Sequence, residues 1–205
     1  MPRGDAQPRN HPKKGSSIRV EPIRDKHAIS RIKARLRERN LRDYCLFTVG
    51  INTAYRAGEL LSLTLSQVAH LGVGDLLQIR QSKTGRYRRT PLNASAAEAL
   101  KVWLEVHPDI SDPHAPLFLS QRSTRALSVQ AANRLIKAWC REEGLTGNFG
   151  SHTLRKTWGY HQRIGNGAPV PLLMTAFGHG SQEQTLTYLY IQEDEIVDLY
   201  RTLEL

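Results

Sequence analysis

A single β-hairpin set among helical segments is the feature that most constrains the fold of this chain. Apolar and polar residues alternate through LLQIRQS, residues 76–82, and a Thr84-Gly85 turn follows. The segment RYRRTPL, residues 86–92, returns and is closed by Pro91. Apolar residues elsewhere recur at helical spacing. We therefore predict an α+β fold that is mainly helical and has one small antiparallel β-sheet.

Helices are predicted on both sides of the hairpin. Residues able to cap helix starts are Asn93 or Ser95, then Ser151, and a capping box made of Ser181 and Gln184. The predicted helical segments are 26–39, 42–52, 93–104, 128–144, 151–165 and 170–178, followed by one that opens at 181.

Positive charge is concentrated at the start of the chain. The sequence has 29 Lys and Arg against 19 Asp and Glu, a formal net charge of +10. Residues 1–17 are rich in Pro, Gly, Ser and basic residues, so we expect a flexible basic arm followed by one domain over 18–205. The charge points to a polyanionic partner, with nucleic acid first, although a basic protein with a solvated tail also fits.

Cysteine usage and apolar runs argue against other classes of protein. Cys45 and Cys140 lie among apolar residues without CxxC spacing, so we expect two buried thiols and neither a disulfide nor a metal site. No apolar run reaches the roughly 18–20 residues that cross a bilayer. The first residues lack the apolar stretch of a secretory signal. A cytoplasmic, nucleoid-associated protein with no membrane partner is expected.

Two spacings of basic residues suit a phosphate. His152 and Arg155, in HTLR, lie three residues apart on one face of a predicted helix. Arg56 begins the segment 56–68, which we expect to run from a short helix into a strand. Glu59 follows Arg56 by three residues, so the pair is either a local ion pair or an anion-binding Arg held by its own carboxylate. Each spacing alone is also common on ordinary protein surfaces.

The predicted hairpin tip carries a dense basic cluster. It contains Lys83, Arg86, Arg88 and Arg89 within seven residues. Exposed hairpin tips often collect Lys and Arg without a function, but such a cluster also suits the phosphate backbone of DNA. We predict Arg86, Arg88 and Arg89 as DNA-binding residues, together with Lys156 in the HTLRK segment.

Taken in order, these segments resemble the tyrosine recombinases, the phage integrase family. AYRAGELLSL is similar to the family's first-arginine segment, and QSKTGRYRRTPL to its β-hairpin lysine segment. SHTLRKTWGYH resembles its HxxR segment, and GHGSQEQTLTY its His-to-tyrosine segment. The resemblance runs from about residue 25 to residue 205. It implies the DNA breaking-rejoining type of catalytic domain, which is mainly helical with a small sheet.

The resemblance implies that Arg56 and Arg155 hold the non-bridging oxygens of a scissile DNA phosphate, and that Glu59 orients the basic cluster. The transition state of phosphodiester cleavage gains negative charge on these oxygens, so fixed cationic donors would stabilise it. A covalent phosphotyrosine would store the bond energy, so rejoining would need neither ATP nor metal. No cofactor and no metal ion are expected.

The nucleophile implied by the resemblance is Tyr188, nine residues after His179. Tyrosine ionises near pH 10, so it needs a cationic site to become a competent nucleophile. Tyr190 would point about 200° away from Tyr188 on a helix, so it is expected to pack or lie exposed. The resemblance further implies that His152 and His179 supply hydrogen bonds and handle protons, and that Lys83 protonates the departing 5′ oxygen.

Three functions fit the sequence. The first is a site-specific DNA recombinase that acts through a 3′-phosphotyrosine in integration, excision or inversion. The second is a DNA-binding accessory or regulatory protein derived from a recombinase, without strand exchange, and the third is a type IB topoisomerase. Most members of the family carry a further N-terminal helical domain, and about 25 residues before the matching region are too few for one.

Double-stranded DNA is the expected partner. The resemblance implies a tetramer on paired DNA sites, and we expect a monomer in the absence of DNA. The C-terminal segment would present one apolar helix face, which either docks on a neighbouring protomer or packs in cis. That face contains Ile196, Leu199, Tyr200 and Leu203.

Overall fold

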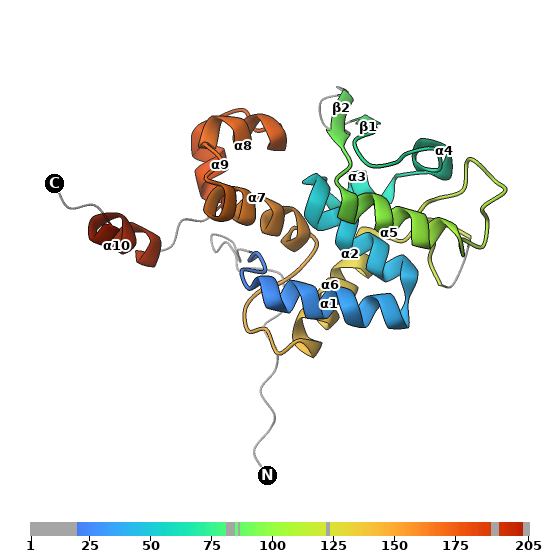
Figure 1. The fold of residues 1–205 in the computed structure, drawn as a ribbon, viewed down its shortest axis with the longest axis horizontal. Helices are drawn as coiled ribbons and strands as arrows, with labels where there is room; N and C mark the ends of the chain where they lie inside the picture. The colour runs from blue at the N-terminus through green and yellow to red at the C-terminus, as the bar shows by residue number, and fades with distance from the viewer. Residues whose placement is uncertain (1–19, 81–84, 86, 122–123, 190–192, 203–205) are drawn as a thin grey trace, which may run out of the picture.

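The computed structural model describes residues 20–80, 85, 87–121, 124–189 and 193–202. The expected basic arm, residues 1–17, lies outside the described residues. The described part is mainly helical and has one two-stranded antiparallel sheet, which confirms the predicted fold class (Figure 1).

The body of the fold is built around a buried helix, α2 (Leu41–Thr53), which packs mainly against three long helices. These are α1 (Lys26–Arg39), α5 (Ala94–Leu104) and α7 (Thr153–Asn166). Most side chains of α2 are buried because other helices cover it on several sides, and its buried Arg42 and Asp43 pair with each other. A further helix, α6 (Val129–Glu142), adds Ile136 and Trp139 to the same core.

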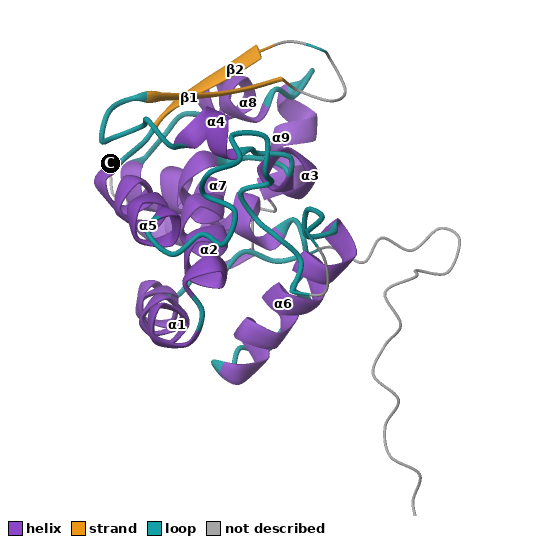
Figure 2. Ribbon diagram, turned by 90° about the vertical axis from the view of Figure 1, so that its right-hand side faces the viewer, coloured by secondary structure: helices purple, strands orange, loops and turns teal. Residues whose placement is uncertain are grey.

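The hairpin is present where the sequence predicts it, with β1 (Leu76–Arg80) paired to β2 (Tyr87–Pro91). Leu77 and Ile79 are buried, as the alternation predicts, and the Tyr55 hydroxyl donates a 2.9 Å hydrogen bond to the Leu77 carbonyl. Figure 2 shows the strands lying across one end of the helices, with α1 and α6 at the opposite end.

One sequence prediction about the segment 56–68 is wrong. The chain forms two short helices there, α3 (Ala57–Leu61) and α4 (Leu65–Val68), instead of a helix and a strand. A capping box explains the second helix, because Thr64 precedes α4 and the Gln67 side chain accepts a hydrogen bond from the Thr64 backbone N–H. The extended structure in this segment is a single bridge from Thr64 to Pro116.

The start of α7 also differs from its prediction. His152, and not Ser151, is the residue immediately before the helix. The Ser151 backbone N–H is bound by the side chain of Asn133, and the Thr153 hydroxyl accepts the Gly150 N–H. These bonds complete a turn before the helix, so the helix begins later than the capping pattern indicates.

Two shorter helices, α8 (Val170–Phe177) and α9 (Gln182–Leu189), follow α7 and pack against it. Gly178 ends α8 in the left-handed conformation, at φ 62°, which reverses the chain toward α9. Ser181 caps α9 through the Gln184 N–H, but the Gln184 side chain accepts from Gly180 N–H, so the predicted box is closed one residue earlier.

The last described helix, α10 (Glu193–Thr202), stands apart from the other helices (Figure 1). An ion pair between Arg163 and Glu195 links it to α7. The side chains of Ile196 and Tyr200 are 45% and 85% exposed, so these two residues of the predicted apolar face do not pack in cis. The Leu199 side chain and Leu203 lie outside the description.

Other expectations from composition can be compared with the described residues. Cys45 and Cys140 are buried free thiols, as predicted. No described helix has both the length and the apolar character needed to cross a membrane. No group of three or more potential metal-binding side chains occurs within the described part of the chain.

Candidate active site

The first predicted arginine lies at the start of α3 and is held by its own carboxylate. Arg56 precedes the helix, and its guanidinium Nη1 donates to Glu59 Oε1 at 2.8 Å. The other carboxylate oxygen of Glu59 accepts the Arg56 backbone N–H, also at 2.8 Å. The Glu59 side chain is only 1% exposed, whereas that of Arg56 is 25% exposed. The pair is therefore a local ion pair that also fixes the orientation of a partly exposed guanidinium.

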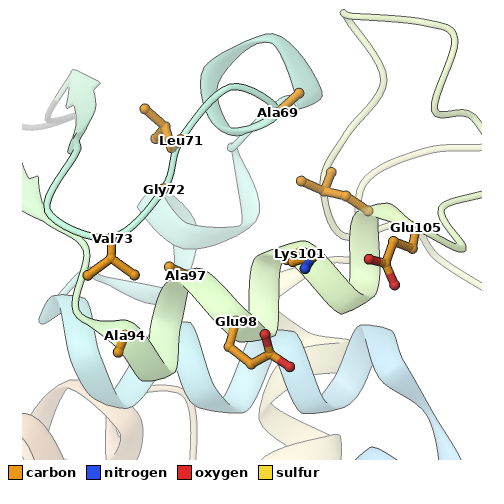
Figure 3. A pocket seen from close by; sticks show the side chains of 10 residues that line it. Ala69, Leu71, Gly72, Val73, Ala94, Ala97, Glu98, Lys101 and Glu105 are labelled. Atoms are coloured by element: carbon orange, nitrogen blue, oxygen red, sulfur yellow. The ribbon is translucent and has the colours of Figure 1, made fainter.

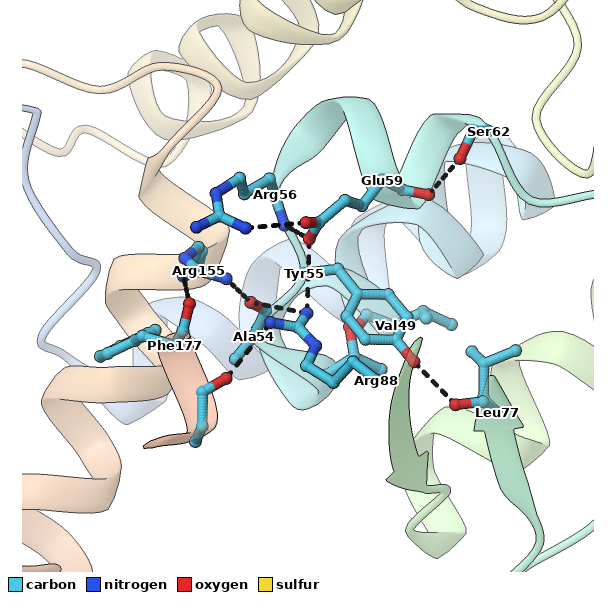
Figure 4. A network of polar contacts seen from close by, with 12 residues as sticks. Val49, Ala54, Tyr55, Arg56, Glu59, Ser62, Leu77, Arg88, Arg155 and Phe177 are labelled. Carbon is cyan, nitrogen blue, oxygen red and sulfur yellow. Dashed lines mark hydrogen bonds and ion pairs between the residues drawn. The ribbon is translucent and has the colours of Figure 1, made fainter. Parts of the chain in front are cut away.

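The second predicted arginine is almost completely buried. Arg155, on α7, is 2% exposed, and its guanidinium donates through Nη1 to the Ala54 carbonyl and through Nη2 to the Phe177 carbonyl. It also lies over the Phe177 ring, 4.7 Å from the ring centroid. These contacts join the end of α2 to the end of α8 (Figure 4) and fix the plane of the guanidinium.

Tyr188, on α9, lies beside the two predicted histidines, His152 and His179, and beside Arg155. Its hydroxyl is 3.4 Å from Nδ1 of His152. Its ring centroid is 5.1 Å from that of His179 and 5.8 Å from the guanidinium carbon of Arg155. Lys156 Nζ lies 4.9 Å from the same centroid. The structure thus brings the phenol into contact range of groups that could take its proton or stabilise its anion.

His179 is held by a short polar chain on α9. Its Nδ1 lies 3.0 Å from the Thr185 hydroxyl, which is also 3.2 Å from the Ser181 carbonyl. A carbonyl can only accept, so both contacts are satisfied when Thr185 donates to Ser181 and His179 Nδ1–H donates to Thr185. In this arrangement Nε2 of His179 is the unprotonated ring nitrogen. The ring itself stacks on Phe177, with centroids 5.0 Å apart.

Burial and positive charge perturb the acid-base groups of this cluster. Desolvation, together with the positive charges of Arg155 and Arg56, lowers the pKa of His179 to about 4. Desolvation raises the pKa of Tyr188 to about 12, although Arg155 and Arg56 oppose that rise. Without DNA, the phenol is therefore protonated and His179 is neutral near pH 7, so phenol attack would require a proton acceptor.

The predicted DNA-binding residues have different environments. Arg89 is exposed on β2 and donates to the Gln78 side chain. Lys156 is buried at 8% exposure against Tyr188, so its position links it to the phenol and not to an outer surface. Lys83 and Arg86 lie outside the described residues, as does Tyr190.

Arg88 departs from its predicted setting. It was expected among exposed phosphate contacts, yet its side chain is only 12% exposed. Its guanidinium lies 4.4 Å above the Tyr55 ring centroid and donates to atoms of the protein itself. The reason is position on the strand, because Arg88 pairs with the buried Ile79 and turns inward, whereas Arg89 turns outward.

Two residues of the cluster, Ala54 and Thr185, make contacts that were not predicted from the sequence. Ala54 contributes only a backbone carbonyl, so its side chain gives no clue to its contact with Arg155. Thr185 is a small polar residue three positions before the tyrosine, but its contact with His179 depends on the turn of α9. The six-residue spacing between His179 and Thr185 is the only signal in the sequence.

A separate hollow lies between α5 and the connection from α4 to β1 (Figure 3). It has a volume of about 700 Å³ and is lined mainly by apolar side chains such as Leu71, Val73 and Leu104. None of the predicted site residues lines it. The polar cluster around Tyr188 is therefore the better candidate for chemistry.

Known proteins match this chain over the region that contains the cluster around Tyr188. The model of the phage integrase family matches residues 24–195. The probable integrase/recombinase YoeC of Bacillus subtilis (strain 168) is 33% identical over 184 residues, covering 89% of this chain and 96% of YoeC. The tyrosine recombinase XerC of Thermodesulfovibrio yellowstonii is 28% identical over 165 residues, covering 78% of this chain. The match spans only 53% of that XerC.

Solved structures give the same fold. The XerA recombinase superposes with a TM-score of 0.71 at 20% identity, covering 89% of this chain and 65% of XerA. A lambda integrase(75-356) dimer bound to a COC' core site gives a TM-score of 0.64 at 20% identity, covering 85% and 60%. Sequence segments, family match and fold agree, and the chain belongs to the phage integrase family of tyrosine recombinases.

Proposed function

We propose that this chain is a site-specific DNA recombinase that cleaves and rejoins DNA through a 3′-phosphotyrosine at Tyr188. The observation that carries the proposal is the grouping of one phenol with two arginines and two histidines, drawn from helix starts and ends far apart in the sequence. The Tyr188 hydroxyl and His152 Nδ1, at 3.4 Å, are its most direct element. The match to YoeC, a probable integrase/recombinase, extends over 96% of that protein and adds support.

In the proposed reaction, the Tyr188 oxygen attacks the scissile phosphorus, and the bond from phosphorus to the 5′ oxygen breaks. The phenol proton passes to an imidazole, for which His152 Nδ1 is within reach. Arg56 and Arg155 stabilise the negative charge that develops on the non-bridging oxygens. Lys83 supplies the proton to the departing 5′ oxygen, a role that rests on the family resemblance. Rejoining reverses these steps on a new 5′ hydroxyl.

Arg56 and Arg155 are held in place before negative charge develops on the non-bridging oxygens. Glu59 holds Arg56, and two backbone carbonyls hold Arg155, before any DNA is bound. Donors that are already fixed need no reorganisation when charge develops, and they act more strongly where water is excluded. DNA binding should therefore depend on these arginines less than cleavage does.

Double-stranded DNA as the partner, and assembly on paired sites, are parts of the same proposal. Similar proteins of known structure include XerH bound to a difH substrate and a lambda integrase dimer bound to a core site. The exposed Ile196 and Tyr200 of α10 support docking on a neighbouring protomer. A basic N-terminal segment over 1–17, a single domain over 18–205 and a nucleoid-associated location belong to this proposal as well.

The test is to trap a covalent protein–DNA adduct. Nicked duplexes from the DNA around the protein's own gene, in which cleavage releases a short fragment, would be incubated with the protein and analysed under denaturing conditions. We expect an adduct whose modified peptide, located by mass spectrometry, contains Tyr188. Tyr188→Phe should keep DNA affinity and lose the adduct, because only the hydroxyl is removed.

The alternatives predict different results. DNA binding without any adduct would favour an accessory or regulatory DNA-binding protein. Relaxation of supercoiled DNA without a two-site recombinant product would favour a topoisomerase. An adduct that persists in Tyr188→Phe and disappears in Tyr190→Phe would move the nucleophile by two residues.

A further inference from the structure

Arg88 occupies a position that no part of the proposed reaction uses. It lies on β2, and its guanidinium is inserted between Tyr55 and the backbone at the ends of α2 and α8 (Figure 4). Only 12% of its side chain is exposed, and both terminal nitrogens of its guanidinium donate to acceptors of the protein itself. Its setting requires another explanation.

The guanidinium of Arg88 donates to three acceptors from three parts of the chain. These are the carbonyl of Ala54 at 3.2 Å, the carbonyl of Ala176 at 3.2 Å and Glu59 Oε2 at 3.4 Å. The first of these acceptors also binds Arg155, and the Glu59 carboxylate also binds Arg56. Arg88 therefore shares one acceptor group with each of the two proposed phosphate-binding arginines.

The shared carbonyl belongs to a residue in an unusual conformation. Ala54 has φ 56° and ψ 21°, the left-handed region, and among the described residues it is the one non-glycine with positive φ. This conformation is disfavoured for residues with a Cβ and is typically retained where surrounding contacts impose it. Here two guanidinium groups bind the Ala54 carbonyl, so the contacts that hold this conformation are also the contacts of Arg155 and Arg88.

Electrostatics argue against a purely stabilising role for Arg88. Arg56 and Arg88 both form ion pairs with the carboxylate of Glu59, and the charges of Arg56 and Arg88 also act on the nearby Arg155. Burying a cation in such surroundings is unfavourable, and an apolar side chain of similar length usually packs as well or better. Desolvation lowers the pKa of Arg88, which agrees with this cost. An arginine at this position is better explained by its directed hydrogen bonds.

We infer that Arg88 is a positioning residue, which orients Arg56 through Glu59 and Arg155 through the Ala54 carbonyl. Because Arg88 is part of β2, the same contacts also connect the hairpin to both arginines. The inference rests on the proposed function, in which these two arginines stabilise the cleavage transition state. Arg88 itself does not contact the phosphate.

The experiment compares Arg88→Met and Arg88→Lys with the unchanged protein. Met removes the charge and the donors, whereas Lys keeps the charge but cannot reach three separated acceptors from one planar group. Single-turnover cleavage of saturated nicked duplex, DNA affinity over a range of salt concentrations, and ¹⁵N relaxation of the Arg56 and Arg155 side-chain Nε–H groups would be measured. Arg37→Met, which removes an exposed arginine of α1 and its ion pair with Glu98, controls for loss of one positive charge and one ion pair outside the site.

We expect both Arg88 variants to cleave saturated DNA about a hundredfold more slowly, because misplacement of a catalytic group by about 1 Å has effects of this size. The salt dependence of binding should not change, and the Arg155 Nε–H group should become more mobile. Arg37→Met should change neither the cleavage rate nor the Arg155 relaxation. Melting temperatures identify any variant that fails to fold, and Arg88→Lys decides the question if Arg88→Met does not fold.

Three results would overturn the inference. One is wild-type cleavage and unchanged Arg155 relaxation in both variants. Another is weaker DNA binding with a salt slope reduced by about 0.9, which would make Arg88 a phosphate contact after all. The third is unfolding of both variants, which would make its role structural. If the unchanged protein forms no adduct, the proposed function fails, and the relaxation measurement still decides whether Arg88 orders Arg155.

Discussion

The two apolar clusters found among the described residues differ in size and in the part of the site that they carry. The large cluster includes most of the buried residues of α1, α2, α5 and α6, and it supports the α3 segment that bears Arg56 and Glu59. The small cluster has only four buried members, which are Ala54, Leu173, Phe177 and Leu189. Tyr188 packs against this small cluster.

This difference suggests that the two halves of the site have different local stabilities. Regions with few buried apolar contacts open more readily than a large core. The phosphate-binding arginine Arg56 is on the well-packed side, whereas the proposed nucleophile is on the weakly packed side. Directed contacts join the two sides, notably the bonds of Arg155 to the Ala54 and Phe177 carbonyls. Substitutions on either side should therefore change the two local stabilities by different amounts.

Arg155→Ala should have the largest effect, because it removes both a proposed transition-state donor and a link between the two clusters. We expect cleavage of bound DNA to fall by about 10²–10³, or roughly 2.7–4 kcal/mol, with a much smaller change in DNA affinity. Hydrogen exchange of α8 and α9 should also become faster. A cleavage rate within about tenfold of the unchanged protein would contradict this role.

Gly159→Val should weaken the small cluster selectively. A Cβ atom at Gly159 would lie 2.5 Å from Phe177 Cζ and 2.8 Å from Leu189 Cδ2, so the helices could not keep their present spacing. Overpacking of this kind costs about 1–3 kcal/mol. Hydrogen exchange should accelerate in α8 and α9 and stay slow in α2.

Gly58→Ala is the matched control for this prediction. Gly58 is also helical, but a Cβ atom there would meet nothing within 4 Å. Alanine should therefore leave exchange in both regions unchanged or slightly slower. Equal acceleration in α2 and α9 for Gly159→Val would show that the two clusters unfold as one unit.

Acid should destabilise the small cluster before the large one. The pKa of His179 is about 4 in the folded protein, below its ordinary value of 6.5, because of desolvation and the Arg155 and Arg56 charges. Between these values the unfolded chain binds a proton that the folded chain does not, so stability falls as the pH is lowered from 6.5 to about 4. Exchange of α9 measured across this range should show it. His179→Gln should flatten the pH dependence, and an unchanged profile in that variant would exclude His179 as its source.

Ala54→Gly should have the smallest effect. Glycine relieves the left-handed strain, worth about 1–2 kcal/mol, but loses about 0.5–1 kcal/mol through greater freedom of the unfolded chain. We expect a gain in unfolding free energy of at most about 1.5 kcal/mol, measured by denaturant titration. Ala54→Val should be destabilising, since a β-branched residue is strongly disfavoured at positive φ. A stabilising Val would show that the backbone at position 54 is not constrained.

Residue spacing along the chain was enough to predict most of the helices, the hairpin and the family. Regular alternation predicted the hairpin at 76–92, and helical spacing predicted most of the helices within a few residues of their bounds. The order of the arginine, HxxR and His-to-tyrosine segments identified the family, because these segments depend on local spacing. The error at 56–68 arose because the capping box of Thr64 and Gln67 starts a helix there. The error at Ser151 arose because hydrogen bonds to Asn133 and Thr153 form a turn before the helix.

Which side chains of the candidate site contact one another follows from the tertiary structure and not from residue spacing. The Arg155 contact with Ala54 joins residues 101 positions apart, and the Arg88 contact with Ala176 joins residues 88 positions apart. In sequence, Arg88 and Arg89 are two adjacent bases of one cluster; in the fold, one is inserted against Tyr55 and the other faces outward. Burial and long-range hydrogen bonds set that difference, and both arise from how the helices pack, which residue spacing alone does not specify.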